Sequence, residues 1–240
     1  KKGKALRFEV SKVRVIKSRT SSGVRGMRLA KDDELISMTI LKDAKFDREI
    51  KDNYLSIALD RRLEIANYEG ESFDVDFIDE LKIMNKESLQ TLSAAEEFIL
   101  GLTANGFGKR TSSYEYRVTS RGGSGIINII TSERNGDVVA SFPVTQSEQI
   151  LLMTDKGKLI RTKITDIRVA GRSTQGVTIL KTEKGEQVVS AAKIAIDESD
   201  DHDLDDDEAD DMDVEMAQPE TVNEAENVAA ITPEESDTSH

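Results

Sequence analysis

The chain has 240 residues, a formal net charge of −13 and no cysteine, which excludes a disulfide framework and a cysteine-ligated metal site. No apolar run is long enough to span a bilayer and no signal-peptide pattern is present, so we expect no membrane partner and a cytoplasmic location. The two histidines, His202 and His240, have no partners at catalytic or metal-binding spacing, which counts against an independent enzyme.

The charge is distributed unevenly along the chain. Residues 197–240 contain 19 acidic residues and no Lys or Arg, which leaves 27 acidic against 33 basic residues over 1–196. Residues 43–97 are acidic as well, and without them the remaining residues carry a net charge of +14. The sequence therefore predicts a basic body, an acidic-leaning insert and a polyanionic tail.

Three segments, residues 3–24, 106–126 and 157–177, resemble one another. In each segment a Gly is followed four residues later by an Arg, then by an Arg-Val pair, and then by another Arg that stands four residues before a second Gly. Because so many matches fall in register at three places, we interpret the segments as an internal repeat.

Residues 1–42 have the composition of one repeat unit built from short strands. We predict strands at 5–8, 13–16, 24–29 and 35–41, which are separated by clusters of Gly, Ser and Asp. The chain opens at Lys1 inside a repeat and without an initiator Met, so we expect a fragment of a longer protein.

Residues 43–94 break this pattern, because the apolar residues from Phe46 to Ala58 follow helical spacing. The last Arg of the repeat recurs after 102 residues across this segment and after 51 residues beyond it. A degenerate repeat of equal length is therefore one interpretation. The helical periodicity favours the other, a partly helical insert in a loop between units.

Strand character returns after the insert. We predict strands at 97–100, 114–118, 125–130, 138–144, 149–153, 159–164, 167–170, 176–180 and 188–194. Asn135-Gly136 marks a hairpin turn. About four short strands in each 51-residue period is typical of propeller blades, so we predict one blade over 95–148 and another over 149–196. Residues 197–240 contain no aromatic residue, and we predict a disordered acidic tail.

Several stretches resemble one family. NGFGKRTSSYEYRVTSRGGSGI (105–126), EEFILGLTANGFGKRT (96–111), TDKGKLIRTKITDIRVAGRSTQGV (154–177) and GVRGMRL (23–29) are similar to the blade repeat of the C-terminal domain of the DNA gyrase A protein. The resemblance implies an all-β, propeller-like β-pinwheel of four-stranded blades, with the partly helical insert and the acidic tail as additions.

The resemblance also implies a function. In that family the domain wraps duplex DNA without sequence specificity, and the gyrase A protein works with a B-type ATPase subunit in ATP-dependent negative supercoiling on the bacterial chromosome. ATP and Mg²⁺ belong to other domains of such a complex, so we expect no cofactor in this chain. Two alternatives are a protein-binding propeller scaffold and the equivalent domain of a topoisomerase IV A-type subunit.

Two family features have no match in this chain. The arginine-rich heptapeptide box is absent, and RGGSG at 121–125 shares only its core. The DNA-cleaving tyrosine of the family follows an Arg, whereas no Tyr of this chain does so. We therefore expect no catalytic residue here, although the parent would be an enzyme.

The candidate DNA contacts are the cations that recur in the repeat, because duplex DNA presents phosphate charge along its whole axis. They are Lys4, Arg7, Arg14, Arg19, Lys109, Arg110, Arg117, Arg121, Lys158, Arg161, Arg168 and Arg172. An alternative role is to hold blades together by bonding loop carbonyls, and both roles stay open for Arg19, Arg121 and Arg172 beside the glycine corners. For Lys109, Arg110, Lys158 and Arg161 we favour contact with DNA.

Many weak contacts fit this task. Bending 20–30 base pairs by 40–90° costs about 1–6 kcal/mol, more than one arginine offsets. The glycines at 122, 123 and 125 allow either a tight turn with positive φ or a close approach of backbone to phosphate. The acidic tail could compete with DNA for the basic surface, or serve only solubility.

Overall fold

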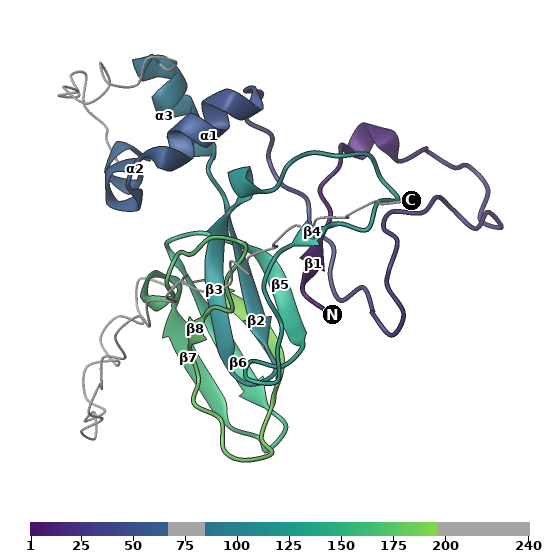
Figure 1. Cartoon of the computed structure of the whole chain (residues 1–240), viewed down its shortest axis with the longest axis vertical. Coiled ribbons are helices and arrows are strands. Elements are labelled where there is room, and N and C mark those ends of the chain that lie inside the picture. The colour runs from purple at the N-terminus through teal and green to yellow at the C-terminus, as the bar shows by residue number, and fades with distance from the viewer. Residues whose placement is uncertain (67–84, 196–240) are drawn as a thin grey trace, which may run out of the picture. The chain divides into compact units, whose positions relative to one another are not determined.

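The computed structural model describes residues 1–66 and 85–195 (Figure 1). The predicted tail over 197–240 and residues 67–84 of the predicted insert lie outside the described residues. Among the described helices, none is both long and apolar enough to cross a membrane.

A four-stranded antiparallel sheet has the order β5-β2-β3-β8 (Figure 1). Strands β2 (Phe98–Thr103) and β3 (Phe107–Ser112) form a hairpin, and β5 (Val138–Val144) pairs with the other edge of β2. Strand β8 (Val177–Thr178) lies in the following repeat but pairs with β3. Each repeat therefore lends a short strand to the repeat before it.

The same exchange joins the first and second repeats. Strand β1 (Lys4–Ala5) pairs with β4 (Ile126–Ile127), which follows the glycine corner of the second repeat as β8 follows that of the third. The last repeat forms a three-stranded sheet in the order β7-β6-β9, with β7 at Leu159–Lys163, β6 at Glu148–Thr154 and β9 at Val188–Ala195.

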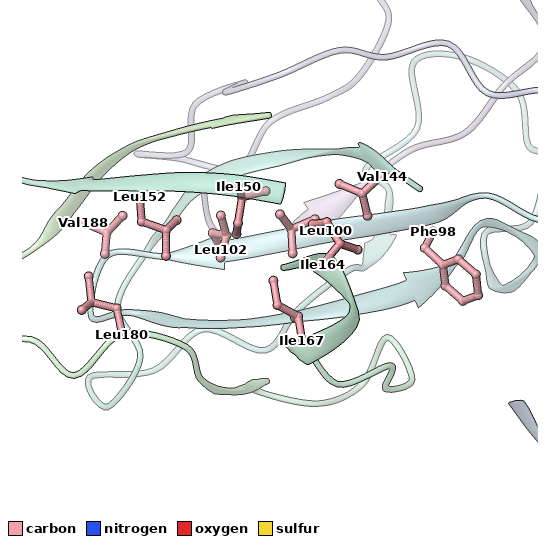
Figure 2. Close-up of a cluster of buried hydrophobic side chains, with 10 residues drawn as sticks. All are labelled: Phe98, Leu100, Leu102, Val144, Ile150, Leu152, Ile164, Ile167, Leu180 and Val188. Atoms are coloured by element: carbon pink, nitrogen blue, oxygen red, sulfur yellow. The ribbon is translucent and has the colours of Figure 1, made fainter. Parts of the chain in front are cut away.

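The main core lies between the two larger sheets and contains residues of both (Figure 2). Alternate residues of β2, such as Leu100 and Leu102, pack with Ile150 and Leu152 of β6. Alternate residues of a strand point to the same face, so Leu100 and Leu102 both reach this cluster, although every residue of β2 is buried. The burial of apolar side chains from two repeats in one cluster makes neighbouring repeats depend on each other.

In its described residues the predicted insert forms the helices α1 (Arg48–Ser56), α2 (Leu59–Ala66) and α3 (Lys86–Ala95). Helix α3 is capped by Asn85, whose side-chain oxygen accepts a 2.8 Å hydrogen bond from the Ser88 amide. We call these helices the helical cap. Its core consists of Ala44, Tyr54, Ile57, Ile65, Leu89, Leu92 and Tyr114, the last of which belongs to the second repeat.

The first repeat has less regular structure than the sequence predicts. Besides β1 it has the 3-10 helix η1 (Val10–Lys12), and the predicted strands at 13–16, 24–29 and 35–41 are absent. Strands β5 and β9 pair with the strand that precedes the first glycine of their repeat. Residues 35–41 hold the corresponding place in the first repeat and form no strand.

The predicted strand at 114–118 is also wrong. The chain there forms the 3-10 helix η2 (Ser113–Glu115), and η3 (Ile164–Asp166) occupies the same place in the third repeat. We call the stretch from this 3-10 helix to the corner glycine the connector of a repeat: Val10–Gly23, Ser113–Gly125 and Ile164–Gly176. The connectors contain most of the predicted DNA-binding arginines.

Candidate nucleic-acid interface

The structure divides the twelve predicted cations into two groups. One group holds neighbouring repeats together through backbone carbonyls, and the other is exposed. Equivalent positions do not always fall in the same group: Arg110 is buried, whereas Arg161, four residues after the corresponding glycine, is exposed.

Lys109 belongs to the first group, and the prediction that it contacts DNA is corrected. Its side chain is buried, with 1% of the residue exposed, and its Nζ donates hydrogen bonds to the carbonyl oxygens of Gly171 and, at 2.9 Å, of Arg172. Burial lowers the pKa of Lys109 to about 8, and the charge of Arg172 acts in the same direction.

The register explains this burial. Lys109 stands three residues after the first glycine of its repeat, where the other repeats carry Leu6 and Ile160. Lys4 and Lys158 stand one residue after that glycine, and both are exposed. The first and third residues after the glycine point to the same face of the strand, so side-chain direction does not distinguish Lys109 from Lys4 and Lys158. Lys109 lies two residues farther along its strand, β3, and is buried there by its contact with the next repeat.

Arg110 is also buried and is corrected in the same way. Its Nε donates to the Ile167 carbonyl oxygen at 2.6 Å, and its terminal nitrogens donate to Gln146 Oε1 at 2.9 Å and to the Thr165 carbonyl oxygen at 3.2 Å. Burial lowers the pKa of Arg110 from its ordinary value. A guanidinium with these partners fixes η3 of the next repeat and has no surface to offer a duplex.

The equivalent Arg7 and Arg161 differ in exposure. Arg7, with 12% of its side chain exposed, donates to the carbonyl oxygens of Ser113 at 2.8 Å and Lys42 at 3.3 Å. Arg161 is exposed, and its Nε donates to Gln149 Oε1. Arg7 therefore has the role between the first two repeats that Arg110 has between the second and third, whereas Arg161 is exposed to solvent.

The corner arginines Arg121 and Arg172 reach back to the preceding repeat. Arg121 donates to the carbonyl oxygens of Lys12 at 3.0 Å and Arg25 at 3.1 Å. Arg172 donates to the Ile127 carbonyl oxygen at 2.9 Å. These bonds match the alternative role given to both residues, the bonding of loop carbonyls between blades.

The exposed group contains one arginine in the middle of each connector: Arg14, Arg117 and Arg168. Within residues 1–66 and 85–195, none of these three guanidinium groups has a hydrogen-bond or ion-pair partner. Lys4, Lys158 and Arg19 are exposed as well. Cations that are solvated and unpaired can bind phosphate without first giving up another partner.

The glycine corners have a packing role. Gly125 has φ +78°, and a Cβ there would lie 2.7 Å from the Ala5 carbonyl oxygen of the preceding repeat. Gly176 has φ +82°, and a Cβ there would lie 2.6 Å from the Gly108 carbonyl oxygen. Only glycine fits a positive φ and this close backbone approach together.

Sequence reasoning missed a buried polar network beside Lys109. The Tyr116 hydroxyl donates to Asn128 Oδ1, and the Thr111 hydroxyl donates to the Ala170 carbonyl oxygen at 2.8 Å. Glu115 Oε2 accepts a 3.0 Å hydrogen bond from the Arg172 amide. The pattern of apolar and polar residues did not reveal these contacts, because each one joins residues at least 12 positions apart in the chain.

Sequence reasoning also left out several exposed cations of the first repeat. Lys12, Lys17, Arg25, Arg28 and Lys31 are all exposed. With Arg14 and Arg19 they make seven cations over residues 10–31, a stretch without Asp or Glu.

Among the described residues, no group of three or more His, Cys, Asp or Glu side chains is placed to hold a metal ion.

Comparison with known proteins gives a consistent result. A family model described as the DNA gyrase C-terminal domain, beta-propeller, matches residues 1–42, 97–145 and 148–195. The helical cap lies between the first two matched segments.

Curated relatives are DNA gyrase A proteins. The protein of Rickettsia bellii is 52% identical over 206 residues, covering 85% of this chain and 22% of that protein. The Granulibacter bethesdensis protein is 41% identical, covering 85% and 23%, and the Salmonella typhimurium protein is 33% identical, covering 85% and 17%. The chain thus spans about a fifth of the length of these relatives.

Two solved structures are similar to part of the chain. One is a DNA gyrase A C-terminal domain, 25% identical, covering 41% of this chain and 33% of that one with a TM-score of 0.39. The other is the C-terminal domain of DNA topoisomerase IV, 24% identical, covering 41% and 31% with the same TM-score of 0.39.

Proposed function

Since this chain belongs to the family of the DNA gyrase C-terminal domain, a beta-propeller, we propose that it binds and wraps duplex DNA without sequence specificity as the C-terminal part of a DNA gyrase A protein. In this role it supports the ATP-dependent negative supercoiling that the gyrase A protein performs with a B-type ATPase subunit. The family and the all-β, bladed fold class expected from the sequence are both confirmed.

The observation that carries the proposal is an exposed, unpartnered arginine in the middle of each connector. Arg14, Arg117 and Arg168 occupy the same position in three repeats that pair with one another strand by strand. A ligand that meets all three must present negative charge at intervals along its length. The phosphate backbone of a duplex has this property.

The first repeat carries the strongest positive charge. Its connector contains four cations and no acidic residue, whereas the connectors Ser113–Gly125 and Ile164–Gly176 each contain two cations and one acidic residue. One cation of each pair, Arg121 or Arg172, is already bonded to carbonyls of the preceding repeat. The duplex is therefore held most firmly at the first repeat and guided by the other two.

These contacts position DNA but do not read its sequence. Flexible cations on connectors bond phosphate oxygens, and such bonds carry no information about base identity. The cost of bending the duplex is offset by the sum of these contacts, as in other proteins that wrap DNA through its backbone.

Filter binding to linear duplex at increasing salt tests the proposal. Each phosphate neutralised adds about 0.9 to the slope of log affinity against log salt, so replacing Arg14, Arg117 and Arg168 together by Gln should reduce the slope by about 2–3. The matched control replaces Arg48 and Arg61 of the helical cap and Lys45, which precedes α1, by Gln, and this removes the same charge from exposed positions off the connectors. A salt-independent wild type, or an equal loss of slope in the control, would contradict the proposal.

A further inference from the structure

The helical cap is anchored to the second repeat at a position where the other repeats carry a small polar residue. Tyr114 stands eight residues after the first glycine of its repeat, in the same place as Ser11 and Thr165. Ser11 and Thr165 are exposed, whereas Tyr114 is 5% exposed. Among the described residues, the helical cap directly precedes the second repeat, so this tyrosine accompanies the cap.

Tyr114 contacts two of the three helices. Its ring meets the ring of Tyr54 on α1 edge to face, with centroids 5.7 Å apart and an interplanar angle of 77°. Its hydroxyl donates a 2.8 Å hydrogen bond to the Leu92 carbonyl oxygen on α3. The Lys51 Nζ of α1 lies 5.8 Å from the centre of the same ring.

The cap is itself held together at this point. The Tyr54 hydroxyl donates to Glu96 Oε2 at 2.7 Å, and Arg62 of α2 forms a buried ion pair with the other oxygen of Glu96. Helices α1, α2 and the end of α3 therefore share one buried polar centre next to the Tyr54–Tyr114 contact. A displacement of Tyr114 would have to break or carry along this centre.

Residues on the other side of η2 belong to the first repeat. Arg7 donates to the Ser113 carbonyl oxygen at 2.8 Å and to the Lys42 carbonyl oxygen at 3.3 Å, and its NH2 lies 3.8 Å from Asp43 Oδ1. Lys42 and Asp43 lie where the first repeat ends, before helix α1. The 3-10 helix η2 is thus fixed between the guanidinium of Arg7 in the first repeat and the Tyr54 ring of the cap.

The connector of the second repeat begins at η2. Three residues after Tyr114 it exposes Arg117, and it ends at the corner where Arg121 reaches the first repeat. With η2 at one end and Arg121 at the other both fixed, the intervening backbone is restrained at both ends. Restraint of a segment lowers the entropy that it loses when it binds a ligand.

We propose that the helical cap braces the DNA-facing connector of the second repeat, and that Tyr114 is the positioning residue through which it does so. This inference rests on the proposed function, because the path of the connector matters only if the connector guides DNA. Tyr114 itself does not touch the duplex. The brace determines where Arg117 stands and therefore how closely the duplex follows the surface.

Hydrogen exchange of the free 240-residue chain tests the brace without DNA. We compare the wild type with Tyr114→Ser, the residue type of the first repeat, and with Tyr114→Phe, which keeps the ring and loses only the bond to Leu92. The matched control is Thr165→Ser, at the same position of the third repeat. Amides of residues 113–121 should exchange about tenfold faster in Tyr114→Ser, since the loss of a buried aromatic contact exceeds the ~1.4 kcal/mol that tenfold represents.

The pattern across the chain separates bracing from general destabilisation. In Tyr114→Ser the amides of β6 and β9 should exchange at the wild-type rate. At residues 113–121, the exchange rate of Tyr114→Phe should lie between those of the wild type and Tyr114→Ser, and that of Thr165→Ser should equal the wild-type rate. Unchanged exchange at 113–121, or equally faster exchange in β6 and β9, would overturn the brace.

Ligation of nicked plasmid in the presence of each variant tests the consequence for DNA. The linking difference per bound chain should be smaller in Tyr114→Ser than in the wild type and unchanged in Thr165→Ser. If the connector loosens in Tyr114→Ser but the linking difference is retained, the positioning role is wrong. If the wild type produces no linking difference, the proposed function fails instead, and the exchange pattern alone then decides whether the brace exists.

Discussion

The Nζ of Lys109 donates a 2.9 Å hydrogen bond to the carbonyl oxygen of Arg172, so a cation of the second repeat holds the corner of the third. In the opposite direction, Arg121 at the corner of the second repeat donates to the Arg25 carbonyl oxygen of the first. Part of the repeated positive charge therefore serves the contact between repeats. The remainder is exposed, and the proposed DNA contacts belong to that part.

The buried position of Lys109 predicts an unusual dependence of stability on pH. Its pKa is about 8 in the folded chain against an ordinary value of 10.5, so between these pH values the unfolded chain binds more protons. The free energy of unfolding should then rise with pH across this window, by at most about 1.4 kcal/mol per pH unit. Replacement of Lys109 by Met removes this titration.

Urea unfolding of the wild type and Lys109→Met from pH 7 to pH 10 measures the effect. The stability of the wild type relative to the variant should increase with pH. A relative stability that stays constant or falls over this range would show that Lys109 titrates normally.

Arg110 and Arg168 should differ in what their loss does. Replacing Arg110 by Met leaves the carbonyl oxygens of Thr165 and Ile167 without their donor, and a buried unsatisfied acceptor costs roughly 1–3 kcal/mol. Replacing the exposed Arg168 by Met should change stability by no more than about 0.5 kcal/mol. Denaturant unfolding measures both changes in stability. Filter binding should then show weaker DNA binding for Arg168→Met, whereas Arg110→Met should bind DNA like the wild type wherever it is folded.

The corner glycines allow a test of the contact between repeats. Gly125 and Gly23 have nearly the same φ, +78° and +75°, but a Cβ would meet the Ala5 carbonyl oxygen only at Gly125, and at Gly23 it would meet nothing within 4 Å. Both substitutions to Ala carry the cost of a left-handed backbone, about 1–2 kcal/mol. Thermal unfolding should show a greater loss for Gly125→Ala, and equal losses would argue against close packing at this corner.

The acidic residues at the end of the chain should compete with DNA. Residues 197–240 carry 19 acidic side chains and no cation, and a tethered polyanion acts at a high effective concentration. A chain that ends at residue 196 should bind duplex more tightly than the full chain at low salt, and the difference should shrink as salt screens the competition. Equal affinities at low salt would leave the segment with no part in binding.

Much of the fold could be predicted because the repeat is visible in the sequence. Strand β5 lies where the apolar run at 138–144 predicts it, and the predicted strand at 149–153 lies within β6. The exchange of β4 and β8 into the preceding repeat could not be predicted, because these strands have two residues each and their pairing is decided by contacts between repeats.

The candidate site was harder to predict for a related reason. Composition and spacing identify which cations recur, but not which of them face the next repeat. Lys109 differs by two positions from Lys4 and Lys158, and Arg7 and Arg161 hold equivalent positions with different exposure. Burial depends on the neighbouring repeat, and that neighbour is distant in sequence.

A change in the topology of closed DNA is the most direct measure of wrapping. Nicked plasmid is ligated with increasing amounts of the chain, and the linking number of the deproteinised product is then measured. We expect a shift of constant sign that grows with the amount of wild-type chain and is lost when Arg14, Arg117 and Arg168 are replaced together by Gln. An unshifted linking number with the wild type, or the same shift with the triple variant, would contradict the account of the connectors as the surface that duplex DNA follows.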